Sequence, residues 1–127
     1  MPHEDDRALV DRYLAAYTAF DVPAMCALLD DAVVFENHSN DRLTAAAEGI
    51  EAFRRLAEAS AGLFSHREQR LVSLRTAPGR AIAVLDFRGT LARDIPGGPE
   101  AGSEIALTGK SEFEFRDGRI TRIIDRS

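Results

Sequence analysis

The spacing of apolar residues changes its period about halfway along the chain, and this change decides which class of fold the chain can adopt. Over residues 9–20 the large apolar side chains recur at every third or fourth position, which is typical of one buried helix face. The same spacing returns over residues 48–63, and a short capped helix is expected over residues 23–29. Beyond residue 70 apolar and polar residues alternate, as they do in half-buried strands.

Segments rich in polar residues, glycine and proline separate the predicted strands. The segment 37–44 is polar and is expected to contain no strand, and the segment 94–102 is expected to be a loop. Strands are predicted over residues 32–36, 70–74, 81–91, 105–116 and 119–125. Helices in the first half and antiparallel strands in the second predict one α+β domain over residues 1–127, with the helices on one face of a curved sheet.

The balance of charges argues against several classes of function. Sixteen basic and 21 acidic residues give a net charge of -5, so the chain lacks the basic field that binds nucleic acid or anionic membranes. No apolar segment is long enough to span a membrane, and the first ten residues lack the features of a signal peptide, so we expect a cytoplasmic protein. Cys26 is the only cysteine, which excludes an internal disulfide and predicts a buried thiol.

Three segments of the chain resemble a known family. They are VDRYLAAYTAFDVPAMCALLDDAVVFEN, EGIEAFRRL and SEFEFRDGRITRIID. These segments are similar to the nuclear transport factor 2-like superfamily, and within it to SnoaL-like polyketide cyclases, ketosteroid isomerases and limonene-epoxide hydrolases. The resemblance covers nearly the whole chain. It implies a cystatin-like α+β roll, in which a cone-shaped antiparallel sheet wraps three helices around a deep and mostly apolar pocket, commonly in a dimer.

Comparison with the ketosteroid isomerases implies a site for proton transfer. Those enzymes use a carboxylate base after the first strand, together with a tyrosine on the first helix and a protonated aspartate on a later strand, which both donate to an oxyanion. In this sequence Tyr13 falls on the tyrosine position, Glu36 on the base position and Ser111 on the aspartate position. A serine hydroxyl is a weaker acid than a neutral carboxyl group, so the implied oxyanion site is weaker.

Comparison with the limonene-epoxide hydrolases implies a different set, in which two aspartates and an arginine activate a water molecule held by asparagine and tyrosine. Asn37, Arg88 and Asp125 fall on matching positions, whereas Thr90 replaces one aspartate and Phe35 replaces the tyrosine. The SnoaL-like cyclases carry an acid/base aspartate at the position of Asp125. The resemblance therefore implies that Asp125 is the acid/base and that Arg88 orients it.

The alternation of side chains along a strand limits which residues can share the pocket. Glu36 and Asn37 are neighbours and cannot both face it unless the strand is irregular, and we favour Glu36. The expected catalytic residues are Asp125, Arg88, Tyr13 and Glu36. The expected substrate-binding residues are Ser111, Phe113, Asn37, Thr90, Phe53 and Tyr17. No metal or other cofactor is expected, because the spacing of His38 and His66 fits no zinc motif.

The residues on the strand face opposite Arg88 predict that the protein binds a second copy of itself. Leu85, Phe87 and Leu91 alternate with Arg88 and are expected to form an apolar patch on the outer face of the sheet. This patch predicts a homodimer. The loop over residues 94–103 is expected to gate the pocket.

These residues lead to three hypotheses for the function. The chain can be a small-molecule pocket protein that performs cofactor-free acid/base isomerisation, cyclisation or dehydration on an apolar carbonyl compound. The same pocket can hold a hydrophobic ligand without catalysis, or the domain can be an interaction module. A purely structural reading also exists, in which Tyr13 is a core residue, Glu36 is solvated, and Asp125 forms an ion pair with Arg88, for which Asp86 is an alternative partner.

Overall fold

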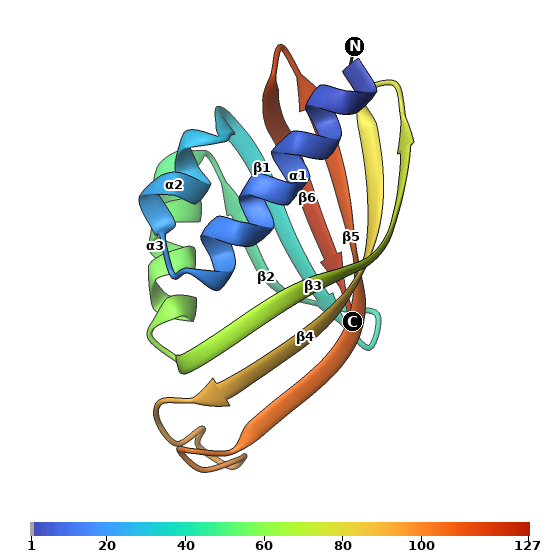
Figure 1. The fold of residues 1–127 in the computed structure, drawn as a ribbon. Coiled ribbons are helices and arrows are strands. Elements are labelled where there is room, and N and C mark those ends of the chain that lie inside the picture. Colours follow the sequence, from blue (N-terminus) through green and yellow to red (C-terminus); the bar gives the residue numbers. More distant parts are fainter. Residues whose placement is uncertain (1) are drawn as a thin grey trace.

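One curved sheet wraps around the helices in the part of the chain that the structure describes (Figure 1). This computed structural model describes residues 2–127, with side chains from Asp6 onward. In chain order the elements are α1 (Pro2–Thr18), α2 (Val22–Ala27), β1 (Leu29–Ser39), β2 (Arg42–Glu48), α3 (Ile50–Ala61), β3 (Phe64–Ala77), β4 (Arg80–Leu91), β5 (Glu104–Arg116) and β6 (Arg119–Arg126). The predicted α+β class, with helices from the first half of the chain inside a curved sheet, is confirmed.

The strand order places the last strand in the interior of the sheet. The order is β2-β1-β6-β5-β4-β3, and neighbouring strands are antiparallel except for β1 and β6, which are parallel. The expectation of a wholly antiparallel sheet is therefore wrong for this pair. Asp117 and Gly118, with φ of 52° and 76°, form the tight turn that leads from β5 into β6. The long connection between β1 and β6 allows the two strands to run in the same direction.

Strand β2 contradicts the expectation that residues 37–44 contain no strand. Its sequence is rich in alanine, a residue type with little preference for strands. It pairs with β1 along its whole length, and Asn40 and Asp41 make the turn between them with φ of 52° and 62°. Strand β3 is likewise much longer than the predicted segment 70–74. Both differences arise because pairing with a neighbouring strand stabilises segments whose own composition predicts no strand.

The helices bury their apolar faces against the concave face of the sheet. On α1, Val10 and Leu14 are buried, and the ring of Tyr13 packs edge-on against that of Phe113 from β5, with centroids 6.0 Å apart. Cys26 is buried, as the sequence predicted. Burial of a large apolar side chain stabilises a fold by about 1.5–3 kcal/mol, so these contacts fix α1 across the sheet.

The side chains of β4 alternate in the opposite sense to the predicted one. Leu85 and Leu91 are buried, and Phe87 faces inward, where its ring meets that of Phe64 at a centroid distance of 5.4 Å. Arg88 lies exposed on the outer face. The apolar patch predicted for a homodimer is therefore wrong, because its residues belong to the interior of the protein. Because side chains alternate along a strand, an error of one residue in the predicted alternation assigns every side chain to the wrong face. The homodimer itself stays a prediction, without this surface.

Gly89 lies on the inner face of β4, where the packing leaves no room for a side chain. A Cβ atom at this position would lie 2.8 Å from the Phe64 ring and 2.9 Å from the Phe87 ring. The two rings contact each other edge to face, and both line the internal cavity. The absence of a side chain at Gly89 therefore allows these two aromatic residues to form part of the cavity wall.

We expect Gly89→Ala to lower the free energy of unfolding by about 1–3 kcal/mol, because the added methyl group must displace packed rings. Urea unfolding of the wild type and the variant measures the loss. Thr90→Ser, at the neighbouring position on the other face, is the matched control and should change the free energy of unfolding by less than about 0.5 kcal/mol. Equal stability of the wild type and Gly89→Ala would contradict this packing.

Candidate functional site

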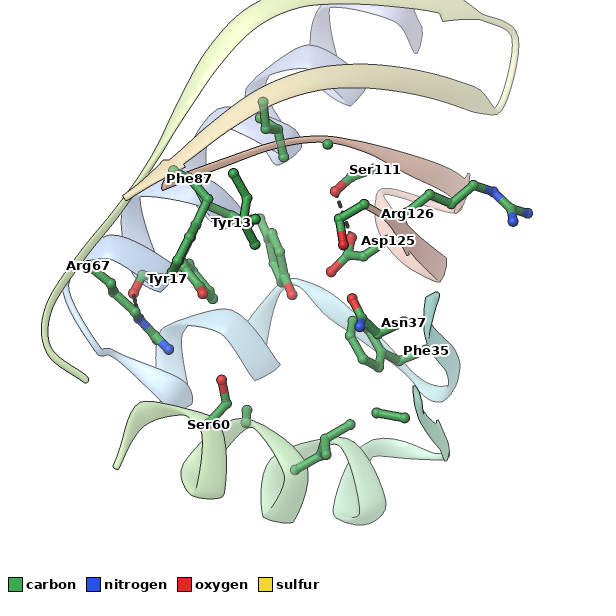
Figure 2. Close-up of a pocket in the computed structure, with 18 of the residues that line it drawn as sticks. Tyr13, Tyr17, Phe35, Asn37, Ser60, Arg67, Phe87, Ser111, Asp125 and Arg126 are labelled. Carbon is green, nitrogen blue, oxygen red and sulfur yellow. Dashed lines mark hydrogen bonds between the residues drawn. The ribbon is translucent and has the colours of Figure 1, made fainter. Parts of the chain in front are cut away.

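A cavity of about 370 Å³ lies between the helices and the concave face of the sheet (Figure 2). This volume is within the range of pockets that bind small molecules. Each helix and each strand of the described chain contributes to its wall. The larger apolar residues of the wall are Met25, Phe35, Phe53, Leu56, Phe64, Leu85, Phe87 and Leu107. Because most of the wall is apolar, the few polar groups in it decide where chemistry can take place.

Asp125 of β6 and Ser111 of β5 face each other in the cavity wall (Figure 2). The two residues are paired in the register of these antiparallel strands, and the Ser111 hydroxyl donates a hydrogen bond of 2.6 Å to Oδ1 of Asp125. Asn37 is the partner of Asp125 on the parallel strand β1, and it also lines the cavity. Its Nδ2 donates to Oγ1 of Thr44 on β2 at 2.7 Å, which holds the amide in place.

The surrounding protein raises the pKa of the Asp125 carboxyl from 3.8 to about 6. Burial is the larger cause, because it disfavours the charged form, and the hydrogen bond from Ser111 lowers the pKa by a smaller amount. At pH 7 the carboxylate is therefore mostly ionised, yet it is a stronger base than an ordinary aspartate. A pKa near the working pH is what general acid/base catalysis requires.

Two tyrosines of α1 lie between Asp125 and Arg67 of β3 (Figure 2). Burial, together with the negative charge of Asp125, raises the pKa of Tyr13 well above its usual value. Burial also raises the pKa of Tyr17, and the positive charge of Arg67 offsets part of this effect. Both phenols therefore stay protonated at neutral pH and can donate hydrogen bonds to an acceptor in the cavity.

Arg67 is a residue of the cavity wall that the sequence did not indicate. Its side chain is only 1% exposed, and its Nε donates a hydrogen bond of 2.8 Å to the backbone oxygen of Tyr17. The guanidinium carbon lies 3.7 Å from the centroid of the Tyr17 ring and 4.6 Å from that of Phe20. Arg67 belongs to a polar stretch without apolar alternation, so only the pairing of β3 with β4 shows that it faces inward.

The structure brings part of the predicted site together. The predicted residues that line the cavity are Asp125, Ser111, Tyr13, Tyr17, Asn37 and Phe53. The predicted residues that do not line it are Glu36, Arg88, Thr90 and Phe113. The loop over residues 94–103, which was expected to gate the pocket, contributes no residue to the wall.

The choice of Glu36 over Asn37 as the residue facing the pocket is wrong. Phe35 and Asn37 line the cavity, so the side chain between them points away from it. Oε1 of Glu36 lies 2.8 Å from Nε2 of His38, and this hydrogen bond is the main reason why the pKa of Glu36 is lowered. Glu36 matches the alternative reading of a carboxylate at the surface of the strand.

The prediction that Arg88 orients Asp125 is also wrong. Arg88 and Thr90 lie on the face of β4 opposite the cavity, because Leu85 and Phe87 occupy the inner face. Ser111 takes the place of Arg88 as the hydrogen-bond partner of Asp125.

Phe113 is on the inner face of β5 but lies deeper than the cavity wall. Its side chain is 1% exposed, and its ring packs against those of Tyr13 and Phe115 with centroid distances of 6.0 Å and 6.2 Å. The expectation that Phe113 contacts a substrate is therefore wrong. It supports Tyr13 from behind.

Two further features of the described residues bear on function. None of the helices in this part of the chain is long and apolar enough to cross a membrane. Among the same residues, no group of three or more histidine, cysteine, aspartate or glutamate side chains is arranged to hold a metal ion.

The sequence matches the family model of the SnoaL-like domain over residues 10–123. The chain belongs to the SnoaL-like domain family. This match, together with solved structures of the same fold, confirms the resemblance to the nuclear transport factor 2-like superfamily. No curated protein sequence matches the chain.

Solved structures from several bacteria share the fold of this SnoaL-like domain. A candidate polyketide cyclase from Xanthomonas campestris pv. campestris is 23% identical, with a TM-score of 0.88 over 100% of this chain and 93% of its own. AclR, a candidate hydroxylase from Streptomyces galilaeus, is 18% identical, with a TM-score of 0.78 over 98% of this chain and 89% of its own. A candidate polyketide cyclase from Pseudomonas putida KT2440 is 26% identical, with a TM-score of 0.73 over 92% of this chain and 86% of its own.

We expect the stability of the wild type to fall relative to that of Asp125→Asn between about pH 4 and pH 7. The pKa of Asp125 is about 6 in the folded protein against 3.8 as the ordinary value, so the folded state binds the proton more strongly in this interval. Ionisation of Asp125 therefore lowers the free energy of unfolding of the wild type by up to about 3 kcal/mol, whereas the amide in Asp125→Asn does not ionise. Urea unfolding of both proteins at pH 4 and pH 8 measures the effect. The same stability difference at both pH values would show that Asp125 has an ordinary pKa.

We expect Ser111→Ala to raise the pKa of Asp125 above about 6, because the lost hydrogen bond stabilises the ionised carboxylate. Carboxyl-carbon NMR of Asp125 measures the titration midpoint directly. A midpoint that stays unchanged or falls in Ser111→Ala would remove Ser111 as the partner that tunes this acid.

Proposed function

We propose that the protein is a cofactor-free acid/base catalyst that moves a proton on an apolar carbonyl compound, with Asp125 as the acid/base. The observation that carries the proposal is a carboxylate with a pKa of about 6 in the wall of a mostly apolar cavity. Membership of the SnoaL-like domain family supports the proposal, as does the likeness in fold to candidate polyketide cyclases.

The proposed step begins with transfer of a proton from carbon to Asp125. The carboxylate takes a proton from the carbon next to the substrate carbonyl, and the electron pair of the broken C–H bond forms an enolate. Return of the proton to another carbon completes an isomerisation. In a cyclisation, the enolate carbon instead attacks a second carbonyl of the same molecule, and the resulting alkoxide takes the proton back from Asp125.

Tyr13 is the proposed donor to the enolate oxygen. Its hydroxyl stays protonated at neutral pH, and Tyr13 and Asp125 both line the cavity. A fixed donor in an apolar cavity stabilises developing negative charge more strongly than water does. Ser111 has a different role from the one implied by the resemblance, because its hydroxyl donates to Asp125 and holds the carboxylate in position.

Exchange of carbon-bound protons of 2-tetralone for deuterium tests the proposal. This apolar bicyclic ketone carries exchangeable protons next to its carbonyl, and NMR in D₂O follows their loss. We expect the wild type to accelerate the exchange and Asp125→Asn to reduce the protein-dependent rate by at least about a hundredfold. Asp86→Asn is the matched control, because Asp86 lies on the outer face of β4, 3.2 Å from Arg70, and should keep the full rate.

The pH dependence of the same reaction identifies the base. The protein-dependent rate should rise with pH, reach half its maximum near pH 6 and then level off, because only the ionised form of Asp125 accepts a proton. Tyr13→Phe should lower the plateau without moving the midpoint far. Binding of 2-tetralone with no acceleration over buffer would overturn the proposal and favour a domain that holds a hydrophobic ligand without catalysis.

A further inference from the structure

We propose that the cavity accepts apolar molecules that carry a carboxylate, and that Arg67 binds this carboxylate on the side of the cavity opposite Asp125. The inference rests on the proposed function in one respect, since it names the class of substrate for the same cavity. The binding it describes can be measured without turnover.

The first observation is a buried positive charge without a negative partner. Arg67 is 1% exposed, and none of the ion pairs found among the described residues includes it. Removing a cation from water costs several kcal/mol unless a partner compensates for it. Among the described residues that line the cavity, Asp125 is the only acidic one, and both tyrosines of α1 lie between it and Arg67 (Figure 2). The positive charge of Arg67 is therefore not balanced by a nearby negative charge among the described residues.

The second observation is the geometry of the guanidinium. Its Nε donates a hydrogen bond to the backbone oxygen of Tyr17, and the rings of Tyr17 and Phe20 lie against the guanidinium. These contacts hold the side chain in one orientation. Its Nη2 is buried and has no hydrogen-bond partner within the described part of the chain. Figure 2 shows this end of Arg67 directed toward the side of the cavity where Ser60 of α3 lies. Protein atoms cover Nη2, whereas other atoms of Arg67 form part of the cavity wall.

The chemistry of the group favours a carboxylate as its partner. A guanidinium presents a planar set of donors that matches the two oxygens of a carboxylate, and such charge-assisted hydrogen bonds are about twice as strong as neutral ones. One cation balances one carboxylate, whereas a phosphate dianion needs more positive charge than this part of the wall provides. The apolar remainder of the wall then contacts the body of the ligand.

The positions of the charges also orient the ligand. A carboxylate is repelled by the ionised Asp125 and attracted by Arg67, so the reacting carbon is directed toward Asp125 and the anionic group away from it. Two other cations, Lys110 and Arg126, line the cavity at exposed positions, and Arg126 is already paired with Glu112 at 2.6 Å. Lys110 is therefore the competing site for an anion.

Two bicyclic probes of matched shape test the inference at pH 8, where Asp125 is ionised. They are 2-naphthoate, which carries a carboxylate, and 2-naphthamide, its neutral counterpart. We expect calorimetry to show that the wild type binds the carboxylate at least about tenfold more tightly than the amide, and that Arg67→Met removes this preference while amide binding survives. Lys110→Met is the matched control and should keep the preference. Equal binding of both probes by the wild type, or loss of the preference in Lys110→Met alone, would overturn the assignment.

A second measurement covers the case in which Arg67→Met fails to fold. The Nε–H resonance of Arg67, assigned through Arg67→Lys, should shift on titration of the wild type with 2-naphthoate and much less with 2-naphthamide. An unmoved resonance at saturation would contradict the inference. Asp125→Asn should keep the preference for the carboxylate even though it loses proton exchange on 2-tetralone, so failure of the binding site and failure of the catalytic proposal give different results.

Discussion

Packing of α1 across the concave face of the sheet is the interaction on which the site depends. Val10 and Leu14 anchor the helix, and Phe113 supports the ring of Tyr13 from behind. The next turn of the same helix places Tyr17 beside Arg67. Because α3 covers the other side of the concave face without filling it, the space that remains is the cavity. The contacts that stabilise the fold therefore also determine which polar groups face a ligand.

The cavity combines two unfavourable features of the folded state, a carboxylate with a raised pKa and a buried guanidinium that has no ionic partner among the described residues. Each lowers stability compared with an apolar residue of the same shape. A protein selected only for stability would not keep both groups in one apolar pocket. Their presence together is the physical reason for proposing chemistry here, because strained electrostatics of this kind are typical of sites that bind or transform a charged or polarised molecule.

The sequence predicts the class of fold correctly because helical and alternating periods are long and well separated. It also predicts the two residues that α1 contributes to the cavity wall, Tyr13 and Tyr17, and the facing residues Ser111 and Asp125, all of which lie in segments that resemble the family. It does not predict which side chains of β4 face the cavity. Both faces of that strand carry apolar residues, and the match of Arg88 to a family position assigned the wrong face to the interior. Arg67 was missed for a related reason. In a polar stretch only the register with β4 shows which residue faces inward, and register depends on residues distant in the chain.

The parallel pairing of β1 with β6 joins two distant parts of the chain at the site. Ser39 at the end of β1 contacts Ser127 just after β6 through a hydrogen bond of 3.2 Å, although 88 positions separate them in the chain. Loop-closure entropy opposes a contact between such distant positions, so the paired strands around it must stabilise it. Asn37 and Asp125 belong to the same pair of strands. The position of Asp125 opposite its amide neighbour therefore depends on this distant pairing, whereas its contact with Ser111 lies within the adjacent β5–β6 pair.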